Sequence, residues 1–77
     1  MDIGMLWFDN DPRADVSAKI SRAAEYYQKK YGHPADLCYV HPSMVKDLNL
    51  KAGTVLVRTN RSVMPNHFWI GVQPASA

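Results

Sequence analysis

The chain has 77 residues, of which 47% are hydrophobic, and a formal net charge of +2. A chain of this length forms one domain at most and buries only about 60% of the surface that its unfolded state exposes, but its apolar content is that of a globular protein rather than a disordered one. Cys38 is the only cysteine, which excludes an internal disulfide, and no apolar run approaches the ~20 residues of a membrane-spanning helix.

The first predicted element is a strand over residues 3–8. Its sequence, IGMLWF, is an uninterrupted apolar run of strand length, which is typical of a strand that is buried on both faces. The sequence DNDP at residues 9–12 ends this run. Because three aspartates lie between residues 9 and 15, the segment predicts either a helix start or a site for chemistry.

A long amphipathic helix is predicted over residues 16–31. Its apolar residues recur at steps of three and four and define one face: Val16, Ile20, Ala23, Ala24, Tyr27 and Tyr31. Asp11, which precedes a proline, is suited to be the N-cap, and Asp15 is a second candidate for that position. Gly32, with a proline two residues later, predicts the C-terminal end of the helix.

Three further elements of regular structure and one short helix are expected in the second half of the chain. Residues 36–42 predict a buried strand closed by a proline, and residues 42–49 predict one or two helical turns. Residues 54–59 predict a β-branched strand. Residues 67–73 alternate in polarity, so that one face of a last strand carries Phe68, Ile70 and Val72.

The element order β-α-β-(short α)-β-β predicts an α/β protein at the border with α+β. We expect one domain over residues 1–73, a disordered tail at 74–77, and a small single-layer mixed sheet with the long helix packed on one face. The first two strands and the helix predict a right-handed βαβ unit with parallel strands, and the last two strands are expected to pair as an antiparallel hairpin. One helix leaves one face of the sheet uncovered, so we expect that face or a strand edge to meet another copy in a homo-oligomer.

Asp9 and Asp11 raise the question of metal-dependent chemistry. Two carboxylates separated by one residue can hold Mg²⁺ together with substrate phosphates. A strand followed by D-x-D resembles the nucleophile motif of the haloacid dehalogenase-type phosphatases, and this resemblance implies phosphate chemistry at these two residues. Those enzymes also use a lysine, a second acidic loop and a threonine or serine loop without counterparts in this sequence, and Pro12 stands where a small polar residue usually follows. We therefore rank phosphate chemistry as a remote alternative to a helix start.

Other motifs for catalysis or metal binding are incomplete. Cys38 and His41 have part of the spacing of a zinc site, but no second pair completes it, and two residues three apart on a strand point to opposite faces. No G-x-S-x-G, phosphate-binding or dinucleotide-binding glycine motif occurs. We expect neither catalytic residues, nor a metal, nor a cofactor, and therefore no enzyme.

A basic stripe on the predicted helix supports nucleic-acid binding as the alternative function. Its members share the face directed away from the core: Lys19, Arg22, Tyr26, Lys29 and Lys30. Cations in such a stripe can contact phosphates while a tyrosine stacks on a base. Glu25, four residues before Lys29, indicates instead an ordinary solvated helix surface.

The aromatic and methionine content favours a protein interface. It exceeds what so small a core can hide, and these residues are enriched at interfaces. The candidates lie in or after the loop that precedes the last strand: Arg61, Met64, His67 and Trp69. We therefore predict a non-catalytic interaction module that self-associates and binds a macromolecular partner, in the first place protein. The acid at position 2 and the single cysteine predict a cytoplasmic protein without a signal peptide or membrane contact.

Overall fold

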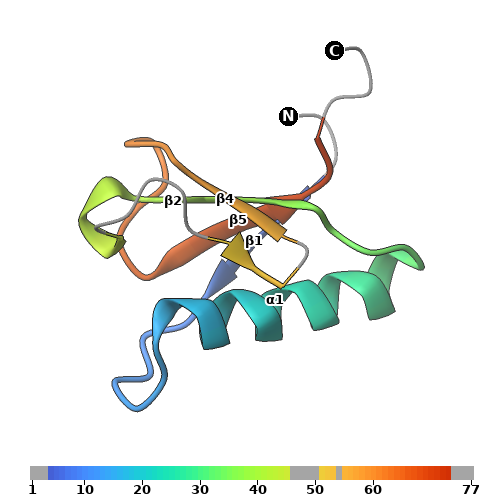
Figure 1. Cartoon of the computed structure of the whole chain (residues 1–77), viewed down its shortest axis with the longest axis horizontal. Helices are drawn as coiled ribbons and strands as arrows, with labels where there is room; N and C mark the ends of the chain where they lie inside the picture. The colour runs from blue at the N-terminus through green and yellow to red at the C-terminus, as the bar shows by residue number, and fades with distance from the viewer. Residues whose placement is uncertain (1–3, 46–50, 54, 74–77) are drawn as a thin grey trace.

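One long helix packs against one face of a mixed sheet in the computed structural model of the chain (Figure 1). The structure describes residues 4–45, 51–53 and 55–73. The elements in chain order are β1 (Gly4–Phe8), α1 (Val16–Tyr31), β2 (Leu37–Val40), the 3₁₀ turn η1 (Pro42–Met44), β3 (Lys51–Ala52), β4 (Val55–Thr59) and β5 (His67–Gly71). The predicted fold class is confirmed, with the two-residue strand β3 as an addition. Residues 46–49 of the helical turns predicted over 42–49, and the predicted tail at 74–77, lie outside the described residues.

Helix α1 has the predicted bounds, but its N-cap is Asp15. Asp15 has extended backbone angles, and its Oδ1 accepts a hydrogen bond of 2.8 Å from the Ala18 N–H. The preferred prediction, Asp11, was wrong because Asp11 closes a separate turn before the helix, in which its carboxylate accepts from the Arg13 N–H at 2.9 Å. At the other end Gly32 has the left-handed φ of 79°, and its N–H donates to the Gln28 carbonyl at 2.9 Å.

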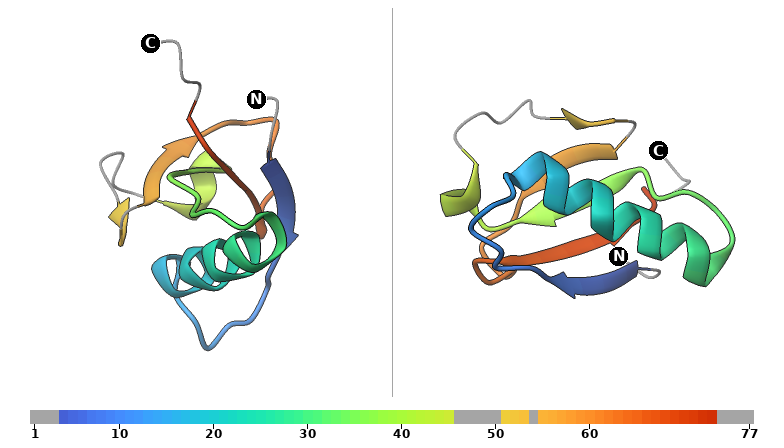
Figure 2. Two further views of the ribbon diagram at one scale, coloured as in Figure 1. Left: turned by 90° about the vertical axis from the view of Figure 1, so that its right-hand side faces the viewer. Right: turned by 90° about the horizontal axis from the view of Figure 1, so that it is seen from below.

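The strand order across the sheet is β1-β5-β2-β4-β3, which corrects one predicted pairing. Strand β5 lies between β1 and β2 and is antiparallel to both, so β1 and β2 are parallel as predicted without being neighbours. The predicted hairpin of β4 and β5 is wrong, because β4 pairs in parallel with β2. Residues 60–66 carry the chain past β2 to the other side of that strand, and the right-hand view of Figure 2 shows the strands in this order behind α1. Because β5 is a central strand, its backbone N–H and C=O groups form hydrogen bonds with β1 on one side and with β2 on the other.

The core fills the space between α1 and the helix-facing side of the sheet. The helix, the sheet and the connection between α1 and β2 contribute buried side chains to it: Ile20, Ala23, Tyr27, Ala35, Cys38, Val40, Val55, Val57, Phe68 and Ile70. Burial raises the pKa of the Cys38 thiol to about 12, so this cysteine is unreactive. No helix in the described part of the chain combines the length and the hydropathy needed to cross a membrane.

Strand β1 is not buried on both faces, contrary to the prediction. Met5 and Trp7 face the helix and pack against the core. Leu6 and Phe8 point to the opposite side and are 63% and 56% exposed. The apolar run did not distinguish a central strand from an edge strand, and the insertion of β5 puts β1 at the edge.

Replacing Asp15 with alanine is expected to lower the free energy of unfolding by about 1 kcal/mol, because the first turn of α1 loses its side-chain acceptor. Asp15→Asn keeps an acceptor oxygen at the same position, so we expect its stability to stay close to that of the wild type. Urea unfolding followed by circular dichroism measures both. Equal losses in the two variants would contradict the cap.

Candidate interaction sites

The face of the sheet opposite α1 has no helix over it in the described residues (Figure 2). We call it the open face. The strand register places one row of side chains across it, with Leu6 opposite Trp69, Trp69 opposite Tyr39, and Tyr39 opposite Arg58. The rings of Tyr39 and Trp69 lie 5.8 Å apart between their centroids, within the range of favourable aromatic pairs. The open face is therefore apolar on the β1 side and becomes charged at β4.

Trp69 lies over a part of the sheet that has no side chains. Gly4 and Gly71 are cross-strand partners in β1 and β5. A Cβ added to Gly4 would collide with the indole carbons of Trp69, including Cζ2. The glycine thus leaves room for the indole beside the backbone of β1, and Trp69 is only partly exposed although no described helix covers this face.

A hollow of about 300 Å³ lies on the open face beside the loop of residues 60–66. We call it the open-face pocket, and it is lined by Leu6, Asn60, Ser62, Val63, Met64, His67 and Trp69. The loop is held by hydrogen bonds from the Asn60 N–H to the Val40 carbonyl at 2.8 Å and from the Ser62 N–H to the Asn60 side chain at 2.8 Å. Buried Val63 anchors its middle. These contacts fix the loop that forms one side of the pocket to the sheet and to the core.

The structure brings together three of the four predicted interface residues. Trp69, Met64 and His67 all line the open-face pocket, whereas Arg61 is exposed in the same loop and does not line it. Leu6 and Phe8 were not predicted as interface residues. Leu6 lines the pocket, and the Phe8 ring packs against His67 at 5.0 Å between ring centroids and an angle of 54° between the ring planes. Side chains alternate between the two faces of a strand, so an alternation of polar and apolar residues could have identified the exposed positions of β1. Every residue of β1 is apolar or glycine, and the sequence therefore shows no such alternation.

The predicted basic stripe on α1 is interrupted by Lys19. This residue is only 7% exposed, so it does not belong to the solvent-facing surface. It follows Val16 by one turn and precedes Ala23 by one turn, which puts its apolar stem on the border of the buried face. The prediction of Lys19 as a surface cation is therefore wrong.

Three of the other four stripe residues, Arg22, Tyr26 and Lys29, line a second hollow of about 310 Å³ on the β1 side of α1. It is lined by Trp7, Arg22, Glu25, Tyr26 and Lys29. Two of the cations are already paired, since Arg22 faces Asp9 and Asp11, and Lys29 lies 3.5 Å from Glu25. Tyr26 packs on Trp7 with 5.2 Å between ring centroids. Lys30 is exposed beside the Tyr31 ring and does not line the hollow.

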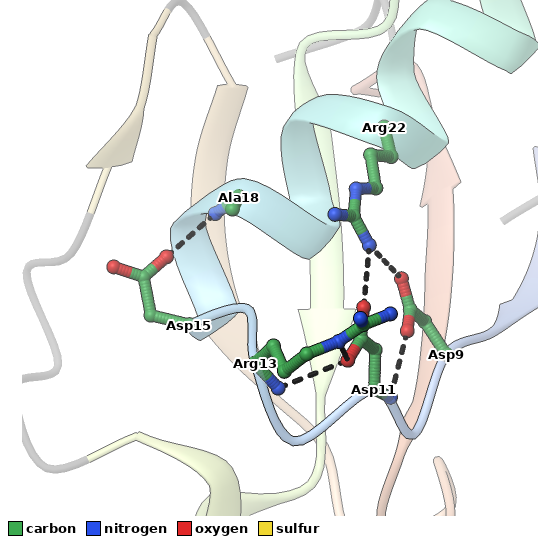
Figure 3. Close-up of polar contacts among 6 residues, drawn as sticks. All are labelled: Asp9, Asp11, Arg13, Asp15, Ala18 and Arg22. Atoms are coloured by element: carbon green, nitrogen blue, oxygen red, sulfur yellow. Dashed lines mark hydrogen bonds and ion pairs between the residues drawn. The ribbon is translucent and has the colours of Figure 1, made fainter.

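Asp9 and Asp11 form a polar cluster with Arg13 and Arg22, and Asp15 lies apart from it (Figure 3). Asp9 Oδ1 accepts from the Asp11 N–H at 3.0 Å, and Arg22 Nη1 lies 3.4 Å from Asp9 Oδ2 and 3.5 Å from Asp11 Oδ2. The Arg13 N–H and guanidinium that donate to Asp11 lower the pKa of its carboxyl, with a smaller contribution from Arg22. Arg22 thus lies where a cation between the two carboxylates would be expected.

Cys38 and His41 do not converge on a common site. Cys38 is fully buried, whereas the His41 Nδ1 lies 2.8 Å from the Ser43 hydroxyl in the turn that follows β2. Across residues 4–45, 51–53 and 55–73, no group of three or more His, Cys, Asp or Glu side chains is arranged to hold a metal ion.

Comparison with known proteins gives no relative for this chain. No model of a protein family matches it, and neither the curated proteins nor the solved structures contain a significant match.

The lowered pKa of Asp11 predicts a pH-dependent contribution to stability. A carboxyl with a depressed pKa in the folded state stabilises the fold above its ordinary value of 3.8 and loses that contribution as the pH falls through the folded-state pKa. We expect Asp11→Asn to lower stability at pH 7 and to approach the wild type at pH values well below 3.8. Urea unfolding at both pH values tests this, and a difference that is independent of pH would contradict it.

Gly4→Ala is expected to destabilise the fold by roughly 1–3 kcal/mol, because the added methyl group displaces the Trp69 indole from β1. Gly4→Ala combined with Trp69→Leu should cost less than the sum of the two single substitutions, since the smaller side chain removes the collision. Thermal unfolding of the four proteins gives this coupling. Strict additivity would show that the indole does not lie over Gly4.

Proposed function

We propose that this protein is a non-catalytic interaction module that self-associates and binds protein through its open face. The partner contacts the open-face pocket. Trp69, Met64 and His67 form the centre of this contact surface, and Arg61 lies at the edge of the surface, outside the pocket. Leu6 and Phe8 extend this surface to the edge of the sheet. A cytoplasmic setting belongs to the same proposal, on the sequence argument that a single cysteine allows no internal disulfide.

The observation that carries the proposal is the exposure of large apolar side chains around one ordered hollow. Leu6, Phe8 and Met64 are 63%, 56% and 65% exposed. These side chains lie around Trp69 and His67, which are partly buried. Helix α1 covers the opposite face of the sheet. Contiguous apolar surface of this kind is typical of protein-binding sites, and a central aromatic side chain with flexible methionine near it is typical of their energetic centre.

Nucleic-acid binding through α1 is the second candidate, supported by the hollow that Arg22, Tyr26 and Lys29 line. The burial of Lys19 and the pairing of Arg22 with two carboxylates reduce the positive charge available to phosphates. Metal-dependent phosphate chemistry at Asp9 and Asp11 is a remote third candidate. The position of Arg22 between those carboxylates weighs against it, because its guanidinium already supplies the compensating charge.

Size-exclusion chromatography with light scattering at micromolar protein concentration tests the first proposal. The wild type should be a dimer or larger, and its mass should be insensitive to salt because the contact is apolar. Met64→Glu places a charge on the surface and is expected to weaken association at least about tenfold, equivalent to ~1.4 kcal/mol. Ser21→Glu is the matched control, since it adds the same charge to an exposed position on α1.

The same experiment with a mixed pool of short oligonucleotides separates the two binding candidates. A monomer that co-elutes with oligonucleotide only at low salt, and loses it when Lys29 and Lys30 are both changed to glutamate, would overturn the proposal in favour of nucleic-acid binding. A wild type that is monomeric, or an oligomer that Met64→Glu leaves unchanged, would overturn self-association through the open face.

A further inference from the structure

Strand β1 leaves one edge of the sheet open. It is the outer strand next to β5, and in both views of Figure 2 no described helix or strand lies beyond it. Natural edge strands are usually protected by charged side chains, proline or a bulge. The sequence of β1, GMLWF, contains no charge and no proline, and its register with β5 is continuous from Gly4 to Phe8.

The register shows which backbone groups of β1 point outward. The Asp9 N–H donates to the Asn66 carbonyl at 3.0 Å, so this pair is a hydrogen-bonded position of the β1–β5 ladder. Because bonded and non-bonded pairs alternate in an antiparallel ladder, Trp7 and Met5 also bond to β5. The N–H and C=O groups of Gly4, Leu6 and Phe8 then point to the open edge. Leu6 and Phe8 thus combine outward backbone groups with side chains on the open face.

We infer that β1 pairs antiparallel with β1 of a second copy, about a two-fold axis at Leu6, so that the two sheets become one. This inference rests on the proposed self-association and specifies the contact. In this register Leu6 bonds to the partner's Leu6, and Gly4 bonds to the partner's Phe8. All three outward-pointing residues of β1 exchange backbone hydrogen bonds, as an isologous interface requires.

The side chains of β1 are self-complementary in this register. Phe8 of one copy comes to lie opposite Gly4 of the other, where no Cβ stands in its way and where the Trp69 indole covers the backbone. Phe8 therefore meets an aromatic surface across the dimer, which is a favourable arrangement. A two-fold axis at Phe8 would instead set Gly4 opposite Pro12, which has no N–H to donate. The register centred on Leu6 is the one that pairs the whole strand.

Single cysteine substitutions on β1 test the pairing and its register. In the proposed dimer the Cα atoms of residue 6 are about 5.5 Å apart across the axis, within disulfide range. The two copies of residue 8 are about 14 Å apart along the strands. Leu6→Cys should therefore form a disulfide-linked dimer under mild oxidation with diamide, and Phe8→Cys should not. Phe8 is the matched control because it is on the same strand and face and has similar exposure.

The wild type is a second control, because its only thiol, Cys38, is buried and unreactive. Equal cross-linking of the two variants would indicate random collisions and overturn the proposal, as would cross-linking of Phe8→Cys alone. If neither variant cross-links while the wild type still scatters as an oligomer that Met64→Glu dissociates, the β1 pairing fails and the open-face function stands.

Amide hydrogen exchange of the unmodified protein gives a readout that needs no substitution. The Trp7 amide bonds within the chain and should be protected at any protein concentration. The Leu6 and Phe8 amides should become protected only as concentration increases and the dimer forms. Protection of Leu6 that does not change with concentration would overturn the pairing.

Discussion

The arrangement of the whole molecule follows from the fact that one helix can cover only one face of its sheet. Helix α1 packs Ile20, Ala23 and Tyr27 onto the sheet, and every strand that it crosses must supply apolar side chains on that side. Side chains on a strand alternate between faces, so the residues between the core positions are placed on the open face. The chain has apolar residues at many of these positions as well, and this is why the surface opposite the helix is the functional candidate.

The insertion of β5 between β1 and β2 determines which strand lies at the edge of the sheet. It separates β1 from β2 and moves β1 to the edge, and it brings Trp69 beside Gly4. The last strand of the chain therefore determines how exposed the first one is. The expected hairpin would instead have made β4 a direct neighbour of β5, in place of β1 or β2.

Local features of the fold could be predicted from the sequence, and long-range pairing could not. The bounds of α1 follow from its apolar period and from Gly32, which act within a few residues of each end. The sequence did not distinguish Asp15 from Asp11 as the N-cap, because the side chain of either residue can accept a hydrogen bond from a backbone N–H two or three residues later. Asp11 accepts such a bond in the turn before the helix, and Asp15 accepts one in the first turn of α1. The strand order depends on contacts between segments distant in sequence, such as Leu37 with Gly71, which no local pattern encodes.

In the candidate sites, too, neighbours in the chain could be predicted from the sequence, whereas contacts between distant segments could not. Trp69, Met64 and His67 are close in the chain and line the same pocket, whereas Leu6 joins them only through the β1–β5 register. The basic stripe was drawn from helical spacing alone, which cannot show that Arg22 meets Asp9 and Asp11.

The distribution of charge on the open face favours contact at the β1 edge over stacking of two whole faces. The cross-strand row begins with Leu6 and Trp69 and ends with exposed Arg58 on β4. Face-to-face stacking of two copies would bring Arg58 into a dry interface, and removing a guanidinium from water is costly. Pairing through β1 leaves Arg58 in solvent on the far side and buries the apolar end, and it also provides partners for backbone groups that would otherwise bond only to water.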